Sequence, residues 1–220
     1  MKNAFTLAEV LITLGIIGVV AALTMPALIA KHKEKQTVVK LKKVYSTLSN
    51  AVMLAVNENG TPDEWTDTEW FYLNDTITDA LLEKLLPYLR VSKYCGRMPC
   101  GANYSVTMLN GDGWGPMNAG GHYGGIFLQD GTYIRAFAQG PFGVYVVDVN
   151  EKKPPNVLGK DVFRFQIDAK GKVMPVGMGS LAACKLSSNG YGCAAWVIFN
   201  ENMDYLHCDD LSWNGKTKCD

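Results

Sequence analysis

The feature that most constrains this chain is a charge-free apolar run from Val10 to Ala30, close to its first residue. As a helix, these 21 residues are roughly 30 Å long at about 1.5 Å per residue, which matches the hydrocarbon core of a bilayer. One carboxylate, Glu9, stands at the start of the run. A charge at that depth is costly unless it has a partner, so Glu9 is a candidate functional residue. The alternative is an interfacial residue beside lipid headgroups.

The segment after the apolar run predicts that the helix continues and changes character. Apolar residues recur at steps of three and four and form one stripe that needs a surface to pack on. The sequence Asn59-Gly60-Thr61-Pro62 is a strong helix terminator. We therefore expect one long helix that ends near Asn59, with a membrane-spanning half and an amphipathic half. The predicted stripe consists of Val38, Leu41, Tyr45, Leu48, Val52 and Ala55.

The first residues resemble the N-terminus of type IV prepilins and of type II secretion pseudopilins. A short basic leader, Met1-Lys2-Asn3-Ala4, precedes Phe5-Thr6-Leu7-Ala8-Glu9 and the apolar run. Pro26 falls where many members of the family carry a proline that kinks the helix. One position departs from the family pattern, because the residue before the cleavage point is usually Gly and is Ala4 here. The resemblance covers about a quarter of the chain.

The resemblance implies a processing and assembly pathway. A prepilin peptidase would cut between Ala4 and Phe5 and methylate the new N-terminus. Residues 1–4 would then be a leader, 5–30 a transmembrane and assembly segment, and 31–220 a soluble pilin-like domain. In a filament, Glu9 would pair with the N-terminal amine of a neighbouring subunit. The implied partners are copies of this chain and other pilin-like subunits, the peptidase, the inner-membrane assembly platform and the membrane itself.

The six cysteines predict disulfides in an oxidising compartment. An even number after a membrane-targeting segment is typical of structural disulfides, and no Cys-x-x-Cys spacing indicates zinc. Fifteen pairings are possible, and local pairing is the simplest of them. We expect the bonds Cys95–Cys100, Cys184–Cys193 and Cys208–Cys219.

Two indications of topology conflict. Six lysines follow the apolar run between Lys31 and Lys43, and only Lys2 precedes it. The positive-inside rule would therefore place the body of the protein, the soluble domain expected at residues 31–220, in the cytoplasm. The cysteines, and the resemblance, place it in the periplasm. We expect a single-pass inner-membrane protein with a periplasmic body that later enters a pilus or pseudopilus. A secretory signal peptide or a plain membrane anchor are the alternatives.

The second half of the chain predicts an antiparallel sheet. A helical pattern from Ile77 to Leu89 precedes a change to two-residue periodicity. Asp130-Gly131 marks a two-residue hairpin turn, and Ala169-Lys170-Gly171 marks a second hairpin. The fold class is therefore α+β, with the amphipathic half-helix packed on the sheet. The expected strands are 104–109, 124–129, 132–137, 143–149, 162–168, 172–176 and 194–200.

One loop of the body has a composition that suits a cation. Asp148, Asn150, Asn156 and Asp161 offer oxygen ligands of the kind that calcium prefers, and some pseudopilins hold calcium in a loop late in the sheet. Asp and Asn also close turns without any metal, and that interpretation is the stronger of the two.

Nothing in the sequence indicates an enzyme or a nucleic-acid-binding protein. The net charge is zero, and no catalytic or phosphate-binding motif occurs. We expect a structural subunit of a type IV pilus or a type II secretion pseudopilus. A minor tip subunit, adhesive or substrate-binding and anchored by the same helix, is the alternative.

Overall fold

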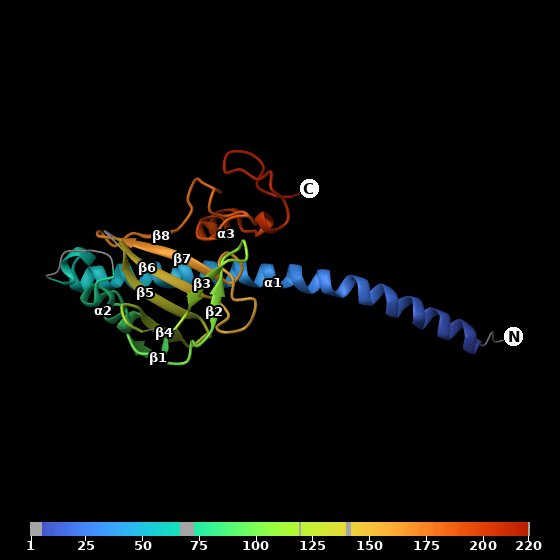
Figure 1. Ribbon diagram of the computed structural model, residues 1–220, viewed down its shortest axis with the longest axis horizontal. Coiled ribbons are helices and arrows are strands. Elements are labelled where there is room, and N and C mark those ends of the chain that lie inside the picture. The colour runs from blue at the N-terminus through green and yellow to red at the C-terminus, as the bar shows by residue number, and fades with distance from the viewer. Residues whose placement is uncertain (1–5, 67–72, 119, 140–141, 220) are drawn as a thin grey trace. The chain divides into compact units, whose positions relative to one another are not determined.

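The computed structural model describes residues 6–66, 73–118, 120–139 and 142–219 (Figure 1). The chain divides into two compact units, residues 1–36 and 37–220, whereas the sequence suggested a boundary near residue 30. The predicted leader and the cleavage pair Ala4–Phe5 lie outside the described residues. Helix α1, Leu7–Asn59, belongs to both units.

In the second unit, α1 packs along the body through the predicted stripe. Val38, Leu41, Leu48, Val52 and Ala55 are buried. Tyr45 is half-buried and stacks on Phe165 at 5.9 Å between ring centroids. Val44 and Ala51 are buried too, so the stripe is wider than predicted. The helix ends where expected, because Gly60 takes a φ of +78° that favours glycine.

The body is built on a six-stranded antiparallel sheet, in the order β1-β4-β5-β6-β7-β8 (Figure 1). Its strands are β1 Val91–Gly96, β4 Gly124–Leu128, β5 Tyr133–Gln139, β6 Phe142–Asp148, β7 Val162–Asp168 and β8 Val173–Pro175. A separate hairpin pairs β2, Ser105–Thr107, with β3, Gly113–Pro116. The other helices are α2 Asp75–Glu83, α3 Cys193–Asn200 and the 3-10 turns η1 Pro62–Glu64, η2 Leu86–Tyr88 and η3 Asp204–Leu206. The predicted α+β architecture, a long N-terminal helix packed on an antiparallel sheet, is confirmed.

Two hairpins form where the sequence predicted them, and one differs in detail. Between β4 and β5, the Leu128 amide donates to the carbonyl of Thr132 at 2.9 Å, so the loop has three residues and not two. Gly131 occupies the position of positive φ, at +82°. The Asp130 side chain accepts a bond from the Thr132 amide at 3.2 Å. The loop between β7 and β8 has the same form around Gly171, with φ +84°. Both are three-residue hairpins with glycine in the left-handed position.

The sheet is buried on both faces, and strand β6 shows this best. Tyr145 and Val147 face a core shared with α1, α2 and α3, whereas Val144 and Val146 face a second core under the β2–β3 hairpin. Because alternate residues of a strand point to opposite faces, a strand buried on both sides is apolar throughout.

The prediction of a strand at 194–200 is wrong, because these residues lie in helix α3. Six consecutive residues from Cys193 to Ile198 are buried in this helix, so its sequence has no polar face. A short, fully buried helix and a buried strand have the same continuous apolar pattern. Two further strands, β1 and β3, were not expected. β1 contains the first disulfide cysteine, and β3 contains two glycines, which disfavour strands.

The helix predicted from Ile77 to Leu89 is shorter than expected. It begins at Asp75, where the Asn74 side chain accepts a bond from the Ile77 amide at 2.9 Å, and it ends at Glu83. Pro87 lies in the following turn η2, because proline has no amide hydrogen to continue the helix.

Candidate functional site

The start of α1 is fixed by a capping box, which was not among the features predicted from the sequence. The Glu9 carboxylate accepts bonds from the Thr6 amide and the Thr6 hydroxyl, both at 2.8 Å. The Glu9 amide donates to Thr6 Oγ1 at 3.2 Å. Thr6 and Glu9 therefore satisfy each other's amides at the helix N-terminus, as Ser/Thr-x-x-Glu sequences do. The spacing of these two residues was the available signal.

The apolar segment after Glu9 is one helix with no buried residue in its most apolar window. Its large side chains are exposed, and Leu23 is 75% exposed. Pro26 lies inside the helix, as the sequence suggested. By length and composition alone, α1 is able to cross a membrane. Such an apolar surface is unfavourable in water, so this segment needs lipid or protein around it.

The four predicted calcium ligands lie at the end of β6 and in the loop that follows it. Asp148 is fully buried and accepts bonds from the Asn150 amide at 2.9 Å and from the Tyr104 hydroxyl at 2.5 Å. Asp161 accepts bonds from the amides of Asn156 at 2.8 Å and of Val157 at 2.7 Å. Both carboxylates therefore hold the loop together through donors of the protein itself. This is the turn-closing role.

Calcium binding at this loop stays a prediction. Asn150 Oδ1 and Asn156 Oδ1 are buried and have no donor among the described residues. Against calcium binding, no group of three or more His, Cys, Asp or Glu side chains within the described ranges is arranged to hold a metal ion. The donor bonds favour turn closure, since a metal would have to compete with them for the same oxygens.

Burial of these acids makes the stability of the body depend on pH. Burial raises the pKa of Asp148 from 3.8 to about 7, against the opposing hydrogen bond from Tyr104. The pKa of Asp161 is raised by burial as well. Between pH 4 and pH 7 the folded state then binds more protons than the unfolded state, so stability falls as pH rises. The slope is at most about 1.4 kcal/mol per pH unit for each group.

The variant Asp148→Asn should flatten this slope, because asparagine does not ionise. We expect the free energy of unfolding of the variant, relative to wild type, to increase from pH 5 to pH 8 in urea titrations of the full chain in detergent. Asp112→Asn, on an exposed turn, is the matched control and should give a constant difference. A constant difference for Asp148→Asn as well would contradict the assigned burial cost.

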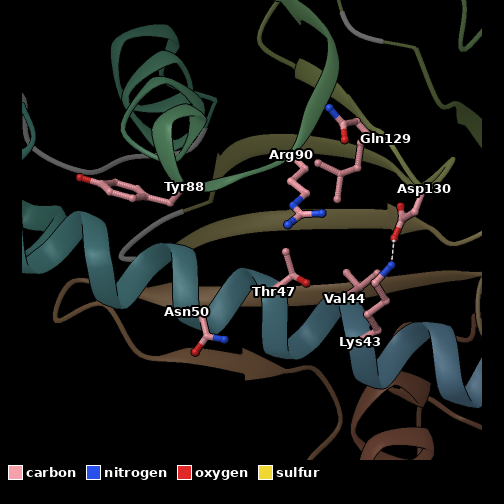
Figure 2. Close-up of a pocket in the computed structure, with 9 residues that line it drawn as sticks. Lys43, Val44, Thr47, Asn50, Tyr88, Arg90, Gln129 and Asp130 are labelled. Atoms are coloured by element: carbon pink, nitrogen blue, oxygen red, sulfur yellow. Dashed lines mark hydrogen bonds and ion pairs between the residues drawn. The ribbon is translucent and has the colours of Figure 1, made fainter.

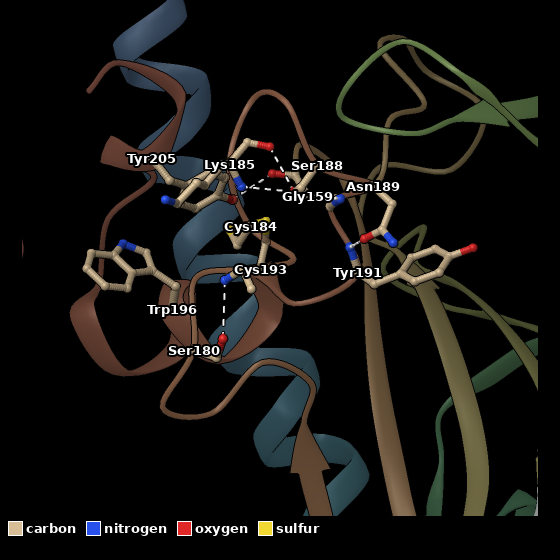
Figure 3. Close-up of a disulfide and its surroundings, with 12 residues drawn as sticks. Gly159, Ser180, Cys184, Lys185, Ser188, Asn189, Tyr191, Cys193, Trp196 and Tyr205 are labelled. Atoms are coloured by element: carbon tan, nitrogen blue, oxygen red, sulfur yellow. Dashed lines mark hydrogen bonds between the residues drawn. A yellow bond between two sulfur atoms is a disulfide. The ribbon is translucent and has the colours of Figure 1, made fainter. Parts of the chain in front are cut away.

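Three disulfides join Cys95 to Cys100, Cys184 to Cys193 and Cys208 to Cys219, the pairs expected from the sequence. Figure 3 shows the second bond, which ties the first residue of α3 to the preceding loop. Both of its cysteines are fully buried. The helix is further held by the Trp196 indole, which donates to Asn202 at 2.9 Å, and by an ion pair between Lys42 of α1 and Glu201. Each of the three disulfides closes a short local loop, and two of them, Cys184–Cys193 and Cys208–Cys219, restrain the C-terminal segment.

A buried arginine on the opposite face of the sheet was also missed. Arg135 of β5 is 6% exposed and lies over the rings of Trp114 and Tyr123, at 4.2 and 4.5 Å from their centroids. Its Nη1 donates to the Pro116 carbonyl at 2.6 Å. Burial lowers the pKa of Arg135 to about 10, so it stays a cation at neutral pH. Arg135 thus fastens the β2–β3 hairpin to the sheet through its cation–π contact with Trp114 and its hydrogen bond to Pro116.

One comparison with known proteins gives a match. The model of a family described as a family of unknown function (DUF6613) matches residues 27–113, which is less than half of the chain. The matched region starts directly after Pro26 and extends to the first residue of β3. No curated protein and no solved structure matches the chain.

Proposed function

We propose that this protein is a structural subunit of a type IV pilus or of a type II secretion pseudopilus. The observation that carries the proposal is the segment Phe5-Thr6-Leu7-Ala8-Glu9 directly before an apolar run with no buried residue. In this account a prepilin peptidase removes residues 1–4, and the mature subunit waits in the inner membrane. The assembly platform then transfers the apolar helix from lipid into a filament.

In this proposal the exposed apolar surface of α1 is covered first by lipid and then by neighbouring subunits. In the membrane, lipid covers the side chains between Val10 and Ala30. In the filament, the same side chains pack against helices of neighbouring subunits. The body and its disulfides remain in the periplasm, where oxidising conditions maintain the bonds.

The geometry at Glu9 is compatible with the assembly role that we propose. In the separate chain the Glu9 carboxylate accepts two hydrogen bonds from Thr6, so it has donors at the edge of the apolar run although its charge has no cationic partner among the described residues. During assembly the amine of Phe5 from a neighbour would take over as the partner. A pair of opposite charges in a low-dielectric environment fixes the relative position of two helices, since a shift leaves both unpaired.

The test is the N-terminus of the protein in its native membrane. We expect a mature chain that begins at methylated Phe5. A major subunit would occupy the repeating subunit positions along purified filaments. The alternative, a minor tip subunit, would be present in few copies per filament. Counting copies separates these two roles once processing is established.

A further inference from the structure

The body has a pocket between α1, the start of β1 and the β4–β5 hairpin, and none of the functions above uses it (Figure 2). Its volume is about 430 Å³, within the range of roughly 300–1,000 Å³ that is typical of small-molecule sites. All of its lining residues lie in the second unit, residues 37–220. Val44 and Leu128 are buried and give it an apolar floor.

The charges around the pocket are not balanced. Lys43 and Asp130 form an ion pair at 2.7 Å and therefore satisfy each other. Arg90 also lines the pocket and has no acidic partner within residues 6–66, 73–118, 120–139 and 142–219. Two cations and one carboxylate leave one net positive charge in the pocket.

The backbone of Arg90 is held in place, and its side chain has no ion pair with any residue in the part of the chain that the structure describes. The Arg90 carbonyl accepts a bond from the Gln129 amide at 2.9 Å, which anchors the residue to the end of β4. Figure 2 shows the guanidinium group directed from there toward the side chain of Thr47 on α1. A planar guanidinium presents paired donors that match the two oxygens of a carboxylate.

We propose that this pocket binds a small polar molecule or side chain through a single carboxylate group, held by Arg90. One negative charge matches the net charge of the lining, whereas a doubly charged phosphate would exceed it and would be repelled by Asp130. The Thr47 hydroxyl offers a further hydrogen bond, and Val44 and Leu128 cover the carbon skeleton of the ligand. This inference is independent of filament assembly, since it depends on the body alone.

The test uses the full chain in detergent micelles and ligand-observed NMR titrations. Two monoanions are the probes: D-galacturonate represents a sugar acid, and N-acetylglutamate α-amide represents an acidic side chain. Each has an uncharged counterpart, D-galactose and N-acetylglutamine α-amide. We expect saturable binding of at least one monoanion, and binding about tenfold or more weaker for its counterpart, because a charge-assisted hydrogen bond is lost. Which monoanion binds identifies the source of the carboxylate.

Variants assign the binding to the pocket. Arg90→Gln should weaken binding by about tenfold or more, and Arg90→Lys should weaken it less because the charge is kept. Lys93→Gln is the control, since Lys93 is an exposed cation of β1 that does not line the pocket. Arg90 is exposed, so these variants should fold, and thermal unfolding checks this. Absence of saturable binding of both acids, equal binding of acid and uncharged counterpart, or unchanged binding by Arg90→Gln would overturn the proposal.

Discussion

Replacing Glu9 by glutamine is expected to give a folded, membrane-held protein that does not enter filaments. In the proposed filament the Glu9 carboxylate neutralises the N-terminal amine of a neighbouring subunit among apolar helices. Removing one partner of a buried ion pair costs about 3–5 kcal/mol, because the other charge remains unpaired. At roughly 1.4 kcal/mol per factor of ten, this is a loss of about two to four orders of magnitude in the incorporation equilibrium.

The capping box at the start of α1 provides the matched control. Thr6→Ala removes the hydroxyl that bonds to Glu9 but keeps the carboxylate, at a cost of about 0.5–2 kcal/mol to the helix end. Glu9→Gln does the reverse, since glutamine also forms capping boxes but carries no charge. Each variant is expressed beside the wild-type chain, and sheared filaments are assayed for it. Thr6→Ala should enter filaments, and Glu9→Gln should not. If Glu9→Gln enters normally, or if both variants fail equally, the charge-pairing role is refuted.

Removing the Cys184–Cys193 disulfide is expected to destabilise the body strongly. The nine-residue separation implies roughly 2–3 kcal/mol from restriction of the unfolded chain. Replacement of both cysteines by alanine also empties space in the core, since both side chains are fully buried. We expect a total loss of about 2–5 kcal/mol, with a fall in unfolding temperature of roughly 5–15 °C.

The pair Cys95 and Cys100 separates the two contributions. Its bond closes a shorter loop, with a five-residue separation, but the entropic contribution depends only weakly on loop length, and both cysteines are only partly buried. The double alanine variant should therefore lose a similar entropic contribution and little packing energy. Calorimetry of both double variants in the same detergent measures the difference. Equal losses for the two pairs would show that burial of Cys184 and Cys193 adds nothing to the effect of the bond.

The parts of the fold that were predictable have local causes. The end of α1 follows from Gly60, and the hairpin positions follow from Gly131 and Gly171, because each glycine adopts a positive φ that other residues avoid. The apolar stripe on α1 was predictable because the period of a helix does not depend on the surface against which the helix packs. Even so, the turn at Asp130 has three residues and not two, since the dipeptide Asp-Gly suits both hairpin forms.

The parts that were not predictable depend on tertiary surroundings. Helix α3 looked like a strand, because burial on all sides removes the periodicity that distinguishes the two. Arg135 and Arg90 are both single arginines beside apolar residues in the sequence. Only the fold places one between aromatic rings and the other at the edge of a pocket. Asn150 and Asn156 are linked to Asp161 by hydrogen bonds, as neighbours in one loop can be, but Asp148 accepts a bond from Tyr104, which is far away in the sequence.

The most direct test of the central proposal is the intact mass of the protein and its N-terminal residue, measured on material from its native membrane. The account predicts a chain that lacks residues 1–4 and begins at Phe5 with one added methyl group on the amine. The same measurement in cells without prepilin peptidase should give the chain beginning at Met1. A chain that begins at Met1 in normal cells would mean a plain membrane anchor. A chain that begins near Lys31 would mean a secreted domain, and either result would contradict the filament account.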